Sequence, residues 1–274
     1  MGQATSVATM SQPTSLDSYS HNRAAWNRQV DGGKNRWTQP VSSDVVDRAR
    51  RGDWQVVLTP TKPVPHAWFG ANQGRLDGLR LLGLASGGGQ QGPIFAAAGA
   101  DVTIFDASDR QLDQDRFVAE RDGLSLRMLQ GNMKDLSALD SSSFDLVFNP
   151  CSLGFVDEVR PVFREVARVL RPGGVFLCGL INPWLFLFDS VAFDEGKLIV
   201  NRRLPYRDID YPDMIAKYYD QGEPISYSHT LADLLGGQLA AGLMLTDLFE
   251  DGWSDWGALA GIAQPFLATR AIKR

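Results

Sequence analysis

Cysteine and histidine are scarce in this sequence. It contains two cysteines, Cys151 and Cys178, and three histidines among 274 residues. Two cysteines cannot build a disulfide framework, which favours a reducing, cytoplasmic setting. Neither residue type shows the close spacing that structural metal sites use, so the sequence predicts no metal site.

Long apolar segments and an excess of basic residues are also missing. The longest apolar stretch, about residues 174–188, is interrupted by Asn182 and Pro183 and is short for a membrane span. Residues 1–20 lack the basic start and apolar centre of a secretory signal, so we expect a disordered leader. The net charge of −5 argues against a nucleic-acid partner, which needs a clustered basic face. We therefore expect neither a membrane nor a nucleic acid as partner.

Two catalytic signatures are absent as well. No Gly-Lys-Ser/Thr follows the glycine-rich segment, which excludes a P-loop. No Gly-x-Ser-x-Gly occurs, which excludes the nucleophile elbow of serine hydrolases.

Strand-like and helical segments alternate over residues 79–181. The strand-like runs are "LRLLGLA", "DVTIFD", "LSLRMLQ", "FDLVFN" and "VFLCGL", and helical patterns separate most of them. A further helix is expected from about Thr230 to Ala241, followed by two final strands. Such alternation predicts an α/β fold with a parallel sheet that helices cover on both faces.

Two regions depart from this alternation. Residues 21–75 are expected to form an N-terminal lid or platform with one short helix, from Ser42 or Ser43 to Gly52. Their aromatic residues either pack on the core or cover a ligand; they are Trp26, Trp37, Trp54, Trp68 and Phe69.

Residues 182–227 interrupt the domain that spans residues 76–274, and they are rich in Trp, Phe, Tyr, Pro and Asp. Ligands of open α/β sheets bind beyond the carboxyl ends of the strands. The segment is therefore predicted to cap a substrate. Its basic cluster of Arg202, Arg203 and Arg207 either binds an anionic group or faces solvent.

A glycine-rich turn, "LLGLASGGGQQG", follows the first predicted strand. Glycine lets the backbone approach a ligand closely, and the next helix offers free N–H groups. Turns of this kind bind dinucleotides, flavins, phosphates and S-adenosylmethionine alike. The turn alone therefore predicts a ligand site without identifying the ligand.

Polar residues follow the next three strands. Asp106 lies roughly 17 residues past Gly89, the spacing of a ribose-binding acid, although it also suits a helix cap. Asn132 and Met133 suit the edge and face of adenine, or form an ordinary turn. Asn149 and Pro150 end the fourth strand, beside the glycine turn.

These motifs, together with "FREVARVLRPGGVFL", resemble in order and spacing those of class I S-adenosylmethionine-dependent methyltransferases. Within that class the chain resembles small-molecule enzymes of the ubiquinone/menaquinone-biosynthesis type. It looks most similar to a bacterial subgroup with "LASGGGQQGP" as its glycine loop. The resemblance covers residues 79–181.

The resemblance implies a Rossmann-like, seven-stranded mixed sheet whose last strand is antiparallel. It implies S-adenosylmethionine as cofactor and a small organic molecule as methyl acceptor, with direct displacement at the methyl group. The implied cofactor-binding residues are Ala85, Ser86, Gly87, Gly88, Gly89 and Gln90 for the methionine part, Asp106 and Ala107 for ribose, Asn132 and Met133 for adenine, and Asn149 and Pro150 near the sulfonium.

The chain departs from the class at two positions. The class commonly has an acidic residue where Gly83 stands, and glycine where Ala85 stands. The usual anchor of the cofactor's amino group is therefore missing. Gln90, Gln91 or residues 62–65 are the alternatives for that role.

No residue is identified as a general base. His229 and His66 are the candidates, and Cys151 is either a small buried residue or part of the cleft. Two other functions share the glycine turn: a methyltransferase-like protein that binds the cofactor without transfer, and an NAD-binding oxidoreductase. We expect a monomer or a homodimer.

Overall fold

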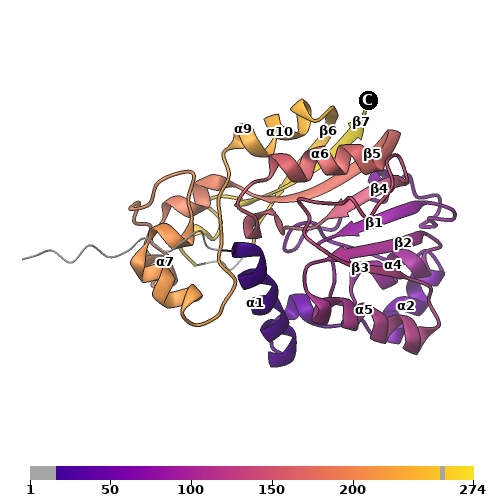
Figure 1. The fold of residues 1–274 in the computed structure, drawn as a ribbon, viewed down its shortest axis with the longest axis horizontal. Helices are drawn as coiled ribbons and strands as arrows, with labels where there is room; N and C mark the ends of the chain where they lie inside the picture. The colour runs from indigo at the N-terminus through magenta and orange to yellow at the C-terminus, as the bar shows by residue number, and fades with distance from the viewer. Residues whose placement is uncertain (1–16, 254–256) are drawn as a thin grey trace, which may run out of the picture.

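A single seven-stranded sheet forms the centre of the computed structural model, which describes residues 17–253 and 257–274. The strand order is β3-β2-β1-β4-β5-β7-β6 (Figure 1). The strands are β1 (Arg80–Leu84), β2 (Asp101–Asp106), β3 (Arg127–Gln130), β4 (Phe144–Asn149), β5 (Leu170–Ile181), β6 (Leu243–Asp251) and β7 (Phe266–Lys273). Strands β1 to β5 pair in parallel, and β7 is antiparallel to both β5 and β6. The predicted mixed sheet with an antiparallel last strand is confirmed.

Helices cover both faces of this sheet (Figure 1). One layer comprises α2 (Ser43–Arg50), α4 (Gln91–Ala97) and α5 (Asp109–Asp122), and the other comprises α6 (Arg160–Val169), α9 (Leu231–Leu234) and α10 (Gly236–Ala240). Each layer has its own apolar core, because each sheet face needs a separate cover. Among the described residues, no helix is long and apolar enough to cross a membrane.

Local sequence signals set the ends of α5. The Ser108 hydroxyl accepts the Gln111 N–H at 3.0 Å, and Gly123 closes the helix at φ 63°. Because α5 starts directly after β2, these signals fix the helix start beside the carboxyl end of the sheet.

The N-terminal region has more helix than the sequence indicated. Helix α1 (Ser18–Gly32) begins inside the predicted leader, and α3 (His66–Phe69) adds a single turn. The prediction of one short helix in residues 21–75 is therefore wrong, and the predicted leader overlaps the first residues of α1, while residues 1–16 lie outside the described residues. Helix α1 buries only Asn22 and Ala25, so it lacks the apolar stripe that identifies a helix.

Residues 182–227, which lie between β5 and α9, carry α7 (Ser190–Asp194) and α8 (Pro212–Met214) and extend away from the sheet (Figure 1). Its basic cluster is divided between ion pairs. Arg202 pairs with Asp213, and Arg207 pairs with Asp210 at 2.6 Å. The two arginines are therefore bound by carboxylates of the same segment.

Candidate functional site

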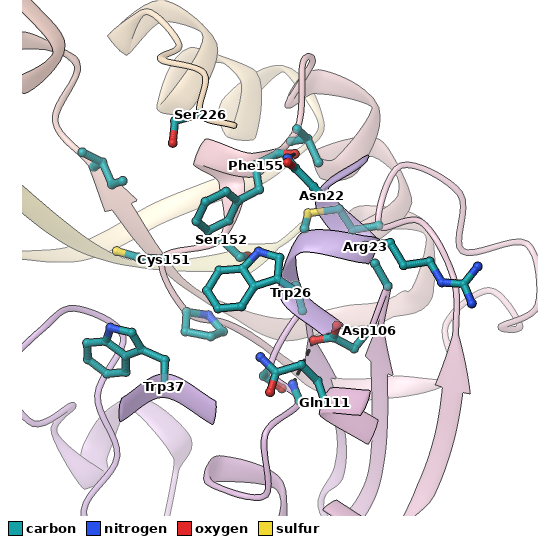
Figure 2. A pocket seen from close by; sticks show the side chains of 18 of the residues that line it. Asn22, Arg23, Trp26, Trp37, Asp106, Gln111, Cys151, Ser152, Phe155 and Ser226 are labelled. Atoms are coloured by element: carbon teal, nitrogen blue, oxygen red, sulfur yellow. Dashed lines mark hydrogen bonds between the residues drawn. The ribbon is translucent and has the colours of Figure 1, made fainter. Parts of the chain in front are cut away.

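A cavity of about 550 Å³ lies at the carboxyl ends of the strands. The loops after β1, β2 and β3, with Pro150 after β4, form one end of it, and residues 151–157, 181–186 and 218–226 contribute to the other together with α1. Figure 2 shows Asp106 and Gln111 at one end and Phe155 and Cys151 further up, with Trp26 between them. The sheet thus brings four loops that are distant in sequence into one site, as the sequence predicted.

Asp106 holds the glycine loop from the end of β2. One carboxylate oxygen accepts the Gly87 N–H at 3.0 Å, and the other accepts the Ser108 N–H at 2.9 Å. Burial raises the pKa of Asp106, and these N–H groups act in the opposite direction. Asp106 also lines the cavity, so the helix-start role and a ligand-binding role are compatible.

A second acid, Asp115 of α5, supports the loop from behind. Its carboxylate is fully buried and accepts the Gly88 N–H at 3.0 Å. Burial, with a smaller contribution from the charge of Asp106, raises its pKa to about 8. The sequence reasoning missed Asp115; the available signal was an acid on the same helix face as Leu112 and Ala119.

The structure explains why this chain departs from its class at Gly83 and Ala85. A Cβ at Gly83 would lie 2.3 Å from the Ser86 hydroxyl oxygen and 2.7 Å from Ile104 Cδ1. An acidic side chain therefore cannot fit there without moving both. Ala85 takes a left-handed conformation at φ 48°, in which its N–H donates to the Phe105 carbonyl at 2.7 Å. The loop thus keeps the turn that glycine usually makes.

Gln90, Gln91 and residues 62–65 were the alternatives for anchoring the cofactor's amino group, and their surroundings differ. The Gln90 side chain lines the cavity, but its amide donates to the carbonyls of Arg36 and Gln39 at 2.7 and 2.9 Å. Gln91 also lines the cavity and is buried. Residues 62–65 do not line it, whereas residues 57–60 do.

The structure corrects the prediction for Gly88 and Gly89, which do not line the cavity. A Cβ at Gly88 would lie 2.9 Å from the Trp37 carbonyl oxygen, and one at Gly89 would lie 2.8 Å from that of Gln114. Both residues also have positive φ, 114° and 69°. They are needed for close approach of the protein's own backbone rather than of a ligand.

The other residues predicted to bind the cofactor also divide into those that line the cavity and one that does not. Ala85, Ser86, Gly87, Ala107, Asn132, Met133 and Pro150 line the cavity. Asn149 does not line it. Its side chain is fully buried and donates to the Leu84 carbonyl and the Ser152 hydroxyl, both at 2.8 Å. It joins the end of β1 to the loop after β4.

Neither candidate base reaches the cavity. A ring nitrogen of His66 lies 2.8 Å from the Trp54 carbonyl oxygen, and the ring stacks on Trp54. His229 is buried, with a ring nitrogen 3.0 Å from the Leu153 carbonyl oxygen, and burial lowers its pKa. Both rings therefore pack against the protein, and a role as base stays a prediction for each.

Cys151 lines the cavity, and burial raises the pKa of its thiol, which keeps the group neutral. Tyr218 also lines the cavity, whereas Tyr206, Tyr211, Tyr219 and Tyr227 do not. The part of the cavity around Cys151 and Tyr218 therefore offers neutral hydrogen-bonding groups.

Helix α1 closes the cavity from the N-terminal side. Its Asn22 amide donates to the carbonyls of Phe155 and Ile225 at 2.9 and 3.0 Å, and Asn27 donates to Asp109 at 2.9 Å. Trp26 contacts Phe155 edge-on with ring centres 5.1 Å apart. Of the N-terminal aromatic residues, Trp26 and Trp37 line the cavity, and Trp54, Trp68 and Phe69 pack in the core. Core packing is thus confirmed for Trp54, Trp68 and Phe69, and covering a ligand stays a prediction for Trp26 and Trp37.

Sequence comparison identifies relatives of the chain. A family model described as a methyltransferase domain matches residues 82–178. The uncharacterized methyltransferase YbaJ of Bacillus subtilis is 42% identical over 255 residues, which cover 92% of this chain and 97% of that protein. A ubiquinone biosynthesis O-methyltransferase of Maricaulis maris is 31% identical over 106 residues, or 39% of this chain and 42% of that enzyme.

Solved structures share the fold. An S-adenosylmethionine-dependent methyltransferase from Mesorhizobium loti has a TM-score of 0.57 at 19% identity, over 73% of this chain and 93% of that one. The 1,6-didemethyltoxoflavin-N1-methyltransferase of Burkholderia thailandensis, solved with 1,6-didemethyltoxoflavin and S-adenosylhomocysteine, has a TM-score of 0.59 at 16% identity, over 96% and 93%. The full-length relative, the matching domain and the shared fold lead to one conclusion: this chain belongs to the class I S-adenosylmethionine-dependent methyltransferases and transfers the methyl group of that cofactor.

Proposed function

We propose that the chain methylates an uncharged, flat organic molecule held beneath α1 and residues 182–227. One observation carries this proposal: the two ends of the cavity differ in chemistry. The end at the strand loops is rich in backbone groups and holds Asp106, while Trp26, Phe155, Phe186 and Trp253 line the remainder. Aromatic walls suit a flat or apolar ligand.

The cofactor is proposed to occupy the end at the strand loops. Ala85, Ser86 and Gly87 would contact its methionine part, Asp106 and Ala107 its ribose, and Asn132 and Met133 its adenine, with Pro150 near the sulfonium. The residues fit such a group, because the buried Ser86 hydroxyl oxygen has no partner among the described residues. A polar ligand atom would remove that desolvation cost.

The cofactor supplies an activated methyl group, so the protein has to align the acceptor and exclude water. The aromatic residues orient the acceptor plane, and α1 closes the cavity above it. Alignment of this kind contributes several kcal/mol, up to roughly 10 kcal/mol in favourable systems.

The charges in the cavity wall support an uncharged acceptor. Arg23 pairs with Asp109 at 3.3 Å, and Lys134 pairs with Asp157 at 2.5 Å. Among the described lining residues, the remaining charged side chain is Asp106, at the end proposed for the cofactor. An acceptor carboxylate or phosphate would therefore find no unpaired cation in the described wall.

The test is a methyl-transfer assay with S-[methyl-¹⁴C]adenosylmethionine and fractionated bacterial small molecules, with products identified by mass spectrometry. Phe186→Ala removes an aromatic wall, and Phe117→Ala is the matched control, because Phe117 lies on α5, 53% exposed and outside the cavity. We expect Phe186→Ala alone to lower product formation about tenfold or more, with affinity for S-adenosylhomocysteine unchanged. Equal product formation by both variants would place the acceptor elsewhere.

We also propose a narrower placement within the class. The partial match to a ubiquinone biosynthesis O-methyltransferase supports the small-molecule branch, and "LASGGGQQGP" is proposed as the mark of a subgroup. Residues 21–75 and 182–227 are proposed as the platform and cap of one methyltransferase domain. The unpaired Cys151 and Cys178 support a cytoplasmic setting, with the chain acting as a monomer or homodimer.

A further inference from the structure

Thr59 is a buried polar residue to which the sequence motifs give no role. It lies in the segment before α3, lines the cavity and is 2% exposed. Its hydroxyl oxygen has no hydrogen-bond partner among the described residues. Buried polar side chains are normally hydrogen-bonded, so a hydroxyl without a partner in a cavity wall calls for a ligand group.

Hydrogen bonds on both sides of Thr59 fix its place in the wall. The preceding residue, Leu58, accepts the Cys151 N–H at its carbonyl at 3.1 Å, just after β4. On the other side, the Thr61 N–H donates at 2.8 Å to the carboxylate of Asp251, at the end of β6. In the sheet, β4 and β6 lie on the opposite side of β1 from β2 and β3. Thr59 therefore belongs to the part of the wall away from the loops proposed for the cofactor.

The neighbouring carboxylate of Asp251 decides which kind of ligand group Thr59 can bind. That carboxylate accepts the N–H groups of Thr61 and Lys62 and the Thr61 hydroxyl. Burial acts to raise the pKa of Asp251, but these donors and the nearby Thr59 hydroxyl lower it, which keeps the carboxylate ionised. An ionised carboxylate attracts the hydrogen of a nearby hydroxyl. The Thr59 oxygen then keeps its lone pairs for a donor on the ligand.

We propose that Thr59 binds the methyl acceptor, accepting a hydrogen bond from a hydroxyl or amino group on its ring. The inference rests on the proposed function, which places the acceptor in the aromatic part of the cavity. It narrows the substrate class from uncharged flat molecules to those that carry an O–H or N–H group. Pro150, proposed to lie near the sulfonium, directly precedes Cys151, so the bound group lies on the side where methyl transfer takes place. An acceptor without this group leaves Thr59 unpaired and binds less well.

Calorimetric titration of the protein saturated with S-adenosylhomocysteine tests this with two flat probes, 2-naphthol and 2-methoxynaphthalene. The probes share one ring system, and only 2-naphthol can donate a hydrogen bond. We expect 2-naphthol to bind about tenfold more tightly. Thr59→Val keeps the side-chain shape without the hydroxyl and should abolish this preference, whereas Thr59→Ser should keep it. Thr269→Val makes the same change at a buried residue of β7 outside the cavity and should leave the preference unchanged.

Equal affinities of the unmodified protein for the two probes would overturn the inference alone, because flat molecules would still bind. A preference that survives in Thr59→Val would also overturn it, since the preference would then have another cause. Failure of both probes to bind would overturn the proposed aromatic acceptor site and the inference with it. Phe186→Ala, titrated in parallel, should weaken both probes alike and keep the preference for 2-naphthol. Melting temperatures of the variants confirm that each one is folded.

Discussion

The two ends of the cavity are built in different ways. At the cofactor end, short loops follow β1 to β4 directly, and buried hydrogen bonds from Asp106 and Asp115 hold their backbone. At the aromatic end, the wall comes from α1, residues 181–186 and 218–226, and Trp253. Polar side chains such as Asn22 and ring contacts such as that of Trp26 with Phe155 join these segments.

This difference separates what is common to the fold from what is particular to the chain. Strand ends of one sheet stay together whatever the acceptor, so the cofactor end can remain constant. Segments outside the sheet can change without disturbing its core. We therefore expect changes at the cofactor end to alter cofactor affinity, and changes at the aromatic end to alter acceptor use.

The largest expected effect compares two tryptophans of the N-terminal region. Trp54 is 4% exposed and packs against Phe69 and Phe95, whereas Trp26 lines the cavity. Trp54→Ala should lower the free energy of unfolding by about 3–5 kcal/mol. Trp26→Ala should cost clearly less and should reduce methyl transfer. Urea denaturation measures both, and equal losses of stability would mean that Trp26 is also a core residue.

The next effect concerns Asp106. Asp106→Ala should weaken binding of S-adenosylhomocysteine by about 1.5–3 kcal/mol, the usual contribution of hydrogen bonds to a charged acceptor. Losing the Gly87 and Ser108 contacts should also lower stability by about 1 kcal/mol. Calorimetry and thermal melting measure the two quantities. A loss of stability with unchanged affinity would show that Asp106 stabilises the start of α5 without binding the cofactor.

A pH-dependent effect follows from the raised pKa of Asp115, about 8 in the folded protein. Between about pH 4 and pH 8 the folded state keeps a proton that the unfolded state has released. Stability should therefore fall as pH rises through this window and level off above it. Asp115→Asn keeps an acceptor for the Gly88 N–H and cannot ionise, so its melting temperature should fall less over the same range. Parallel curves for both proteins would contradict the assignment.

The smallest effect is expected at the two histidines outside the cavity. His66→Gln and His229→Gln should change the rate of methyl transfer by less than about twofold, because neither ring lines the cavity. Initial rates under saturating cofactor measure this. A loss of a hundredfold or more, in a variant with a normal melting temperature, would restore that histidine as a base.

The sequence predicted the part of the site that local patterns control. The glycine turn, Asp106 and Asn132 each follow a strand directly, and parallel strands bring their carboxyl ends to one edge. Side-chain direction was not predictable in the same way. Asn149 points into the protein because the Leu84 carbonyl and the Ser152 hydroxyl lie there, and only the fold reveals that.

Helix α1 shows a second limit. Its stability comes from an Asp17 cap, from Gly33 at φ 60° and from contacts such as that of Arg23 with Asp109. These partners are distant in sequence or too common to mark a helix. The acid that supports the glycine loop from behind was likewise hidden, because Asp115 looks like an ordinary residue of a helix.

A crystal structure with S-adenosylhomocysteine tests the central claim, that one end of this cavity is for the cofactor and the other for the acceptor, most directly. The account predicts that the ribose hydroxyls lie within hydrogen-bond distance of Asp106, that adenine contacts Asn132 and Met133, and that space remains between Trp26, Phe155 and Phe186. An adenosyl group bound among those aromatic residues, with Asp106 still free of ligand, would contradict it.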